Sequence, residues 1–156
     1  MPFPINVNRV STQQKALAPE ISTWPDENPQ LIGSRCGACG VVTFPRQLGC
    51  ARCGAADMRD EPLHRRGTLY TWTTQGFMPK EPYLVDSTDE PFAPYLLGYV
   101  ELPEQVRVEG RLINCDLESV HIGMEMELTL FPLRHDEAGR EVMMYAFQPV
   151  ASGGAS

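Results

Sequence analysis

The sequence predicts a mostly β protein with an N-terminal arm at residues 1–30, a cysteine-rich unit at 31–66, a five-stranded barrel at 67–150 and a flexible tail at 151–156. Three observations lead to this fold class. Four of the five cysteines form two C-x-x-C pairs. Five later segments have the composition or the alternation of strands, and no strong helical period interrupts them. A chain of 156 residues has room for one ordinary domain, or for a small unit and a small barrel.

The arm is rich in proline, which removes backbone donors and excludes a long helix. Its prolines are Pro2, Pro4, Pro19, Pro25 and Pro29. Ser11 followed by Gln14 predicts the cap of one short helix that ends before Pro19. Trp24 is the largest apolar group of the arm. Two interpretations stay open: the arm straps over the protein's own core, or Trp24 contacts a partner chain.

The cysteine-rich unit has the spacing of a metal site. Cys36, Cys39, Cys50 and Cys53 give C-x2-C-x10-C-x2-C. Two residues between cysteines let both thiolates of a tight turn reach one ion, and four soft anionic ligands favour Zn²⁺ over iron. Because sulfur fills all four positions, we expect a structural metal with no position for substrate. A thioredoxin-like redox motif would instead place a single C-x-x-C at the start of a helix.

The barrel segments are rich in aromatic and β-branched residues or alternate between apolar and polar side chains. They cover 67–76, 95–102, 105–113, 124–130 and 141–150. In the third, Val106, Val108 and Leu112 face one side. In the fourth, the inward residues are Met124, Met126, Leu128 and Leu130. Five strands with short connections predict an OB-type barrel, and the DLESVHIG segment lies where such a barrel often has a helix or crossover.

Charge and hydropathy limit the possible partners. Residues 31–66 carry six arginines against three acidic residues, a net charge of +3, whereas residues 67–156 carry five basic and fourteen acidic residues, a net charge of −9. An acidic barrel does not attract a phosphate backbone, so we expect no nucleic-acid partner. No run approaches the roughly 18 apolar residues of a membrane helix, and we see no secretion signal. We therefore expect a cytoplasmic protein without a membrane partner, in which clustered cysteines hold metal.

No catalytic grouping is evident in the sequence. Cys115 stands alone, and His64, His121 and His135 are distant from it along the chain, so we interpret it as an inert, half-buried thiol. The sequence contains no G-x-S-x-G, Walker or dinucleotide-binding motif. We predict no catalytic residue in this chain.

The order of parts resembles a known family. The stretches LIGSRCGACGVVTFPRQ, GTLYTWTT, APYLLGYVELPEQVRVEGRL, HIGMEMELTL and YAFQPV are similar to the OB-fold acyl-CoA-associated family with an N-terminal rubredoxin-like zinc ribbon, from about Ile21 to Val150. The chain departs from many members at the second cysteine pair, GCARC, which lacks a proline after its first cysteine.

The resemblance implies a non-catalytic accessory subunit of a thiolase-fold enzyme. That enzyme would be a β-ketothiolase or an aldolase acting on acyl-CoA esters, of the kind used in aromatic or steroid side-chain degradation. It also implies a hetero-oligomer in which the thiolase-fold partner carries the nucleophilic cysteine. The small subunit would complete the complex and help to seat the CoA ester at the shared interface.

Phosphate recognition suggests which residues would contact CoA. Arginine binds phosphates through paired hydrogen bonds, and the arginines concentrate in or beside the cysteine-rich unit. Arg46 is the best candidate because Phe44 and Pro45 fix its loop. Arg65 and Arg66 follow at the junction with the barrel. The alternative is that Arg46 is a solvated surface residue and that Arg65 and Arg66 form ion pairs between domains.

A long loop at residues 77–94 carries several large apolar groups that are costly to leave in water. With Trp24, the candidate partner-interface residues are Phe77, Tyr83, Leu84 and Phe92. The alternative is that this loop folds back over the open end of its own barrel. A second function class is a single-stranded nucleic-acid-binding module, because Tyr70, Trp72, Tyr95 and Tyr99 supply aromatic rings for stacking.

Overall fold

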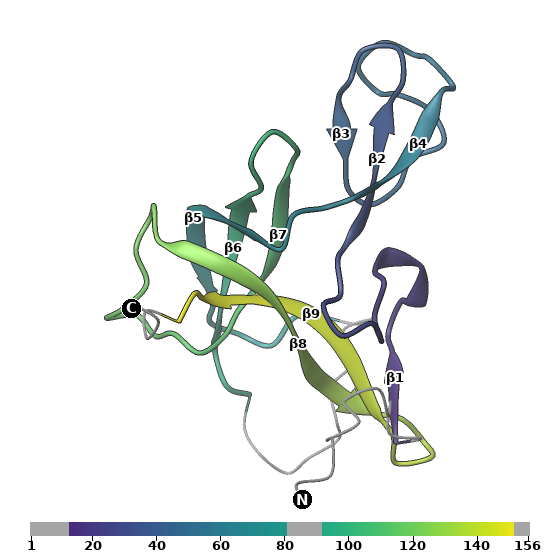
Figure 1. The fold of residues 1–156 in the computed structure, drawn as a ribbon. Coiled ribbons are helices and arrows are strands. Elements are labelled where there is room, and N and C mark those ends of the chain that lie inside the picture. Colours follow the sequence, from purple (N-terminus) through teal and green to yellow (C-terminus); the bar gives the residue numbers. More distant parts are fainter. Residues whose placement is uncertain (1–12, 81–91, 152–156) are drawn as a thin grey trace, which may run out of the picture.

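The computed structural model describes residues 13–80 and 92–151. Strands dominate these residues, and the only helical element in them is a single 3-10 turn, η1 (Pro19–Ile21). Figure 1 shows a small three-stranded sheet above a larger, strongly curved sheet. The mostly β fold class is confirmed. None of the described residues form a helix long and apolar enough to cross a membrane.

The larger sheet closes into a five-stranded barrel. Its strands are β5 (Arg66–Gln75), β6 (Tyr95–Glu101), β7 (Arg107–Leu112), β8 (Glu125–His135) and β9 (Glu141–Pro149). They pair in the order β5-β6-β7-β9-β8, and β8 returns to β5 to close the ring. The β7–β9 pair is parallel and the other barrel pairs are antiparallel. This is the OB-type barrel that the alternation predicts.

The barrel interior is formed by the residues that alternate inward. Val108, Leu112, Met126 and Leu128 are buried as expected, whereas Val106, Met124 and Leu130 are only partly buried. Phe147 from β9 is fully buried among them. These side chains come from every second position of adjacent strands, which is the arrangement a closed barrel needs to fill its centre.

Strand β8 extends beyond its predicted end at Leu130 and includes Pro132. Proline cannot donate to a ladder, and the register shifts between Pro132 and Arg134, so a bulge accommodates the ring. The β8–β9 hairpin consequently projects past the barrel, as Figure 1 shows. Its turn is held by Asp136, whose pKa lies well below its usual range because its carboxylate accepts the Arg140 backbone N–H at 2.8 Å.

The predicted short helix in the arm is wrong. Residues Gln14–Ala16 form strand β1, which pairs in parallel with β9. Gln14 lies opposite Glu141, and its side-chain amide donates to the Glu141 carboxylate at 3.0 Å. The projecting end of β9 leaves an edge that a strand can pair with, and this long-range pairing overrides the local capping signal. The Ser11 of that signal lies outside the described residues.

The connection between β7 and β8 contains turns and no helix. The backbone N–H groups of Ser119 and Val120 donate to the Asp116 carbonyl, at 3.2 and 2.9 Å. The sequence left open whether the DLESVHIG segment is a helix or a crossover without one. The structure shows the crossover.

The smaller sheet packs on the barrel and shares its core. Its strands are β2 (Ile32–Cys36), β3 (Val42–Thr43) and β4 (Met58–Pro62), in the order β3-β2-β4. Three buried residues from or beside it, Leu31, Val42 and Leu63, belong to the same apolar cluster as the barrel interior. In addition, the Phe44 ring meets the Tyr145 ring of β9 edge-on, with centroids 5.8 Å apart. The two sheets therefore form one packed body.

Candidate metal centre

Two chain turns of the same design bring the four cysteines together. In the first, β2 ends at Cys36, whose carbonyl accepts the Gly40 N–H at 2.9 Å. In the second, the Cys50 carbonyl accepts the Gly54 N–H at the same distance. Both glycines have positive φ, 78° and 77°, a conformation that glycine adopts without steric cost. The doubled C-x-x-C-G pattern of the sequence thus becomes a doubled backbone turn.

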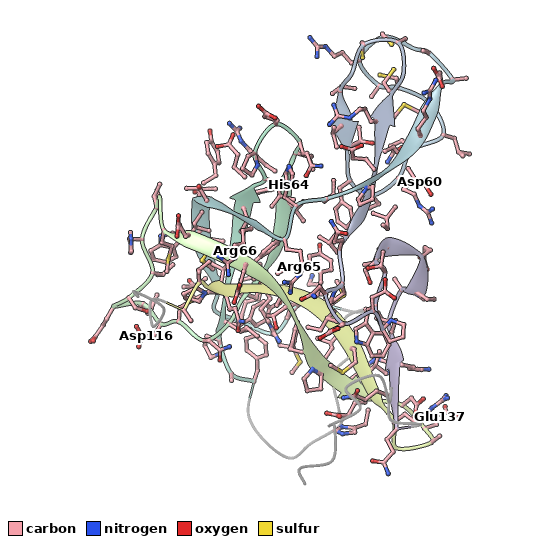
Figure 2. All side chains as sticks on the ribbon, viewed as in Figure 1. Asp60, His64, Arg65, Arg66, Asp116 and Glu137 are labelled. Atoms are coloured by element: carbon pink, nitrogen blue, oxygen red, sulfur yellow. The ribbon has the colours of Figure 1, made fainter. Side chains whose placement is uncertain are left out.

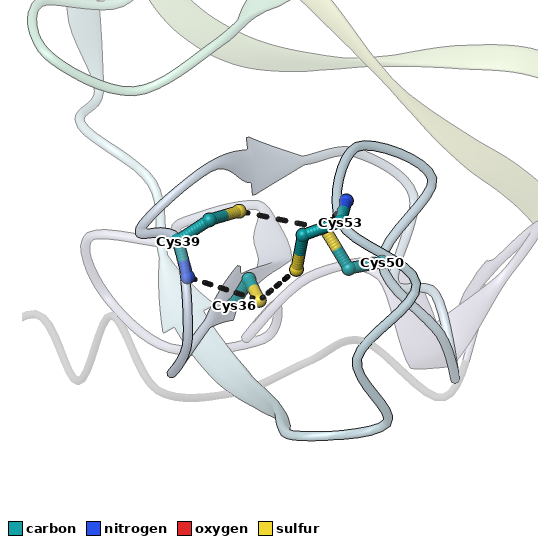
Figure 3. A group of neighbouring side chains, drawn as sticks. All are labelled: Cys36, Cys39, Cys50 and Cys53. Carbon is teal, nitrogen blue, oxygen red and sulfur yellow. Dashed lines mark hydrogen bonds between the residues drawn. The ribbon is translucent and has the colours of Figure 1, made fainter.

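The sulfur atoms have the spacing of a tetrahedral site (Figure 3). The Sγ atoms of Cys36 and Cys53 are 3.6 Å apart, as are those of Cys39 and Cys50, and all four lie within 4.8 Å of one another. A Zn–S bond of about 2.3 Å places neighbouring sulfurs of a tetrahedron roughly 3.8 Å apart. The four side chains therefore fit a single divalent ion, with Cys36 and Cys50 on the buried side.

Backbone donors prepare two of the sulfurs for the thiolate form. The Cys39 N–H donates to Cys36 Sγ at 3.5 Å and lowers the pKa of that thiol. The Cys53 N–H donates to Cys50 Sγ at 3.4 Å and lowers the pKa of Cys50 to about 6. Hydrogen bonds to a charged form favour that form. A metal ligand must be the thiolate, so these donors favour the ligating state.

Without a cation, the four sulfurs cannot all ionise together. The pKa of Cys53 is raised to about 12: the backbone N–H of Ala55 lowers it, but the contacts with Cys36 and Cys50 raise it by more. A divalent ion removes this conflict, because its charge stabilises all four thiolates at once. The donor set and its electrostatics are those of a metal-binding cluster.

A chain of hydrogen bonds connects the first cysteine turn with the barrel. Arg35 donates to the Gly40 carbonyl at 3.0 Å and to the Glu61 carboxylate at 2.8 Å. The same carboxylate oxygen accepts the side-chain amide of Gln105, which precedes β7, at 3.1 Å. The amide oxygen of Gln105 in turn accepts the His64 backbone N–H at 2.8 Å.

The roles of Glu61 and Gln105 in this chain of hydrogen bonds cannot be recognised from the sequence. They are polar residues at the end of one strand and in a turn, without a motif. The hydrogen bond from Arg35 lowers the pKa of Glu61, so this carboxylate is ionised in the folded protein.

The three arginines predicted to contact CoA all make contacts within the chain. Arg46 donates to the Asp60 carboxylate at 3.0 Å and to the Glu20 carbonyl at 2.9 Å, and so links the arm to the small sheet. Arg65 donates to the carbonyls of Pro29 and Leu128. Figure 2 shows Asp60, the partner of Arg46, on the small sheet and at a distance from Arg65.

Arg66 differs from the other two because its guanidinium is largely exposed. It forms a 3.3 Å ion pair with Glu127 of β8, and its side chain retains 68% of its accessible surface. CoA contact by Arg46, Arg65 and Arg66 stays a prediction. Of the three, Arg66 has the most surface left for an external phosphate.

The predicted interface residues lie in different settings. Trp24 is half-buried and lines a small cavity with Leu130 and Met143 of the barrel hairpin, so part of its ring covers the protein's own core. Phe77 is 73% exposed, and Phe92 packs edge-on against Tyr95 with centroids 6.0 Å apart. Tyr83 and Leu84 lie outside the described residues.

Cys115 lies apart from the cysteine cluster and is half-buried. Burial, followed by the charge of Asp116, raises the pKa of its thiol. A raised pKa lowers the thiolate fraction and therefore the nucleophilicity at neutral pH. This environment agrees with an inert thiol.

The aromatic residues that suggested nucleic-acid stacking share their surface with carboxylates. The Tyr99 hydroxyl donates to Glu109 at 3.1 Å, and Arg107, whose guanidinium covers the Tyr70 ring at 3.7 Å, pairs with Glu101 at 3.3 Å. These carboxylates oppose the approach of a phosphate backbone. Around Tyr70 and Tyr99, the described residues therefore do not form the basic groove of a single-strand binder.

Comparison with known proteins covers both parts of the fold. Residues 24–59 match the rubredoxin-like zinc ribbon domain of ChsH2, and residues 60–131 match the C-terminal OB-fold domain of ChsH2. Among solved structures, the chain resembles one in an Ltp2-ChsH2(DUF35) aldolase, with a TM-score of 0.58 and 24% identity over 78% of this chain and 86% of that one. That likeness concerns the fold.

Relatives of known description align over most of their length. The chain is 32% identical over 122 residues to a DUF35 domain-containing scaffold protein of Methanocaldococcus jannaschii, covering 77% of this chain and 82% of the relative. It is 30% identical over 140 residues to the benzoylsuccinyl-CoA thiolase subunit BbsA of Geobacter metallireducens, covering 85% of each. It is also 30% identical to the BbsA subunit of Thauera aromatica over 78% of each chain. With its four-cysteine ribbon followed by a closed OB barrel, this chain belongs to the ChsH2 (DUF35) family.

Proposed function

We propose that this chain is a non-catalytic accessory subunit of a thiolase-fold enzyme that acts on acyl-CoA esters. The observation that carries the proposal is the alignment with two BbsA thiolase subunits, which extends over both sheets and most of each chain. An alignment of 140 residues includes parts of the arm, the ribbon and the barrel. The acyl groups we propose are those of aromatic or steroid side-chain degradation.

The proposal includes a division of labour between the subunits. The thiolase-fold partner supplies the nucleophile, and this chain completes the complex and helps to seat the CoA ester at the shared surface. The raised pKa of Cys115 supports its exclusion from catalysis. Cys115→Ala should therefore change the turnover of the complex by less than about tenfold, whereas a loss of a hundredfold or more would make Cys115 catalytic.

We propose that the cysteine cluster holds one structural Zn²⁺ through Cys36, Cys39, Cys50 and Cys53. Four sulfurs complete the tetrahedron and leave no position for substrate. When bound, the ion supplies folding energy to a small sheet that has few buried apolar residues of its own. Elemental analysis of protein purified without chelator should give one zinc per chain, and Cys50→Ser should lose it.

The exposed apolar residues beside the barrel are the proposed contact with the partner. Phe77 is mostly exposed, and so is half of the Met78 side chain that follows it. Large apolar groups of this kind form the centre of protein interfaces. Trp24 and Phe92, which are both half-buried, are further proposed contacts with the partner.

Co-expression tests the proposal directly. The chain should co-elute in size-exclusion chromatography with a co-expressed thiolase-fold protein of the same organism, and Phe77→Ser should weaken this association. Leu48→Ser is the matched control, because Leu48 is an apolar residue with 96% of its surface exposed on the small sheet's loop. Separate elution of the two proteins at micromolar concentration would contradict the accessory role.

A further inference from the structure

A groove on the outer surface of the barrel is not explained by the metal centre or by the proposed accessory role. It is lined by Tyr95 and Leu97 of β6, Arg111 of β7, Phe131 and Leu133 of β8 and Met144 of β9. Its volume of about 360 Å³ is within the range of small-molecule sites. The groove exists because the β8–β9 hairpin projects past the barrel and curves away from β7, to which β9 pairs only at Ala146 and Phe147.

Arg111 is the one cation among the described residues that line this groove, and aromatic rings hold it in place. Its guanidinium lies 3.7 Å from the centroid of the Tyr95 ring and 5.2 Å from that of Phe131. Two rings from different strands fix the orientation of a side chain that would otherwise be mobile. Such cation–π contacts act on the faces of the guanidinium and leave the N–H groups at its edge available.

No hydrogen bond or ion pair joins the Arg111 guanidinium to another described residue. In contrast, Arg107 on the same strand also stacks on a tyrosine, but its guanidinium pairs with Glu101. Arginine carries several donors in a planar fork that matches a carboxylate in a bidentate arrangement. A rigid, unpaired fork facing apolar side chains is therefore complementary to a ligand with a carboxylate and an apolar body.

The charge around the groove limits the part of the ligand that enters it to a low negative charge. Glu109 also lines it, two residues before Arg111, and its carboxylate accepts the Tyr99 hydroxyl instead of pairing with Arg111. Repulsion from Glu109 grows with the charge of the ligand, so a polyphosphate is penalised more than a monocarboxylate. The neighbouring Leu97, Leu133 and Met144 favour an aliphatic or aromatic body.

We propose that this groove binds an organic monocarboxylate whose carboxylate accepts two N–H groups of Arg111 and whose apolar body lies on Leu97, Leu133 and Met144. Arg111 is the specificity-determining residue of the site, and Tyr95 and Phe131 position it. The carboxylate can belong to a free acid or to the distal end of a CoA thioester. The inference is independent of the accessory role, since it concerns ligand binding by this chain alone.

Calorimetric titration of the full chain with 4-phenylbutyrate tests the proposal. We expect saturable binding, which Arg111→Met weakens by about tenfold to a hundredfold, because a charge-assisted bidentate contact is lost. Arg107→Met is the matched control and should bind like the natural protein, since it removes the other stacked arginine of the same strand. Arg111→Lys should lie between the two, because it keeps the charge but loses the fork.

The neutral amide 4-phenylbutyramide separates charge recognition from apolar binding. It should bind the natural protein at least about tenfold more weakly than the acid. This comparison needs no variant, so it decides the question even if Arg111→Met fails to fold. Three outcomes would each overturn the proposal. The acid and the amide could bind equally well, Arg111→Met and Arg107→Met could have equal effects, or the natural protein could show no saturable binding up to about 10 mM.

Two CoA thioesters distinguish the sources of the carboxylate. Glutaryl-CoA carries a distal carboxylate and butyryl-CoA does not. An Arg111-dependent preference for glutaryl-CoA assigns the groove to the acyl end of a CoA ester. Arg111-dependent binding of 4-phenylbutyrate without this preference assigns the groove to a free acid.

Discussion

Replacing Leu63 by alanine should destabilise the cysteine ribbon and the barrel together. Leu63 lies between the last ribbon strand and the first barrel strand and is completely buried. Its backbone N–H donates to the Leu31 carbonyl at 2.8 Å, and its own carbonyl accepts the Gln30 amide at 3.1 Å. The side chain belongs to the apolar cluster that both sheets share. Its removal therefore leaves a cavity at the junction and not in one sheet alone.

The size of the effect follows from this burial. Truncation of a fully buried leucine costs about 2–5 kcal/mol of unfolding free energy, out of about 5–15 kcal/mol for a typical domain. With a guanidinium dependence of a few kcal/mol per molar, the unfolding midpoint should fall by about 0.5–1 M. Both transitions should move by the same amount, because one cooperative unit contains both sheets.

Two probes in one guanidinium titration check this expectation. Tryptophan fluorescence reports on the barrel and arm through Trp72 and Trp24, and the release of zinc to a chromogenic chelator reports on the ribbon. Leu48→Ala is the control, since this exposed side chain should contribute less than about 0.5 kcal/mol. If Leu63→Ala shifts zinc release but leaves the fluorescence transition in place, the shared core does not couple the two sheets and the reasoning is refuted.

Three further outcomes can be measured on single variants. Gly33→Ala should lower the unfolding midpoint strongly, because a Cβ atom there would collide with the backbone carbonyl oxygen of Thr43 in β3. Gly49→Ala, with open space around it, should not lower the midpoint, and equal midpoints of the two variants would contradict the packing. The hydrogen bond from Arg35 lowers the pKa of Glu61 below its ordinary value. The contribution of Glu61 to stability is therefore present above that ordinary pKa and is lost as the pH falls through the lowered one. Glu61→Gln should thus be less stable than the natural protein at neutral pH, with a difference that shrinks in acid, and a constant difference would argue against the ion pair. Cys115 should react with iodoacetamide at neutral pH more slowly than a free cysteine, because burial raises its pKa, and a faster reaction would contradict this environment.

The parts of the fold that the sequence predicted are those with short-range signals. The spacing of Cys36 to Cys53 and the alternation around Val108 are local, so they identify the ribbon and the barrel strands before any tertiary contact is known. The predicted strand ends at Leu130, whereas β8 continues to His135. Proline is unfavourable in a strand, and only the pairing with β9 shows that a bulge accommodates Pro132.

The parts that could not be predicted depend on contacts between distant residues. Gln14 belongs to a strand only because Glu141 lies beside it, 127 residues later in the chain. Likewise, Arg111 is an ordinary outward-facing residue in the alternating pattern. Its special setting requires Tyr95 and Phe131 from two other strands. To find the setting of Arg111 from the sequence, one would need to know which outward-facing residues of neighbouring strands lie side by side.

The position of β9 at the centre of the pairing has a consequence for the order of folding. β9 pairs with β1, β7 and β8, yet among the strands of the described residues it comes last in chain order. Until it emerges, the barrel cannot close, the arm has no edge to pair with, and the β8 ladder is open along most of its length. Long-range pairing of this kind slows folding and leaves unpaired edges exposed in the nascent chain. Fragments truncated before Glu141 should therefore aggregate during synthesis, and production of this protein should benefit from slower expression at lower temperature.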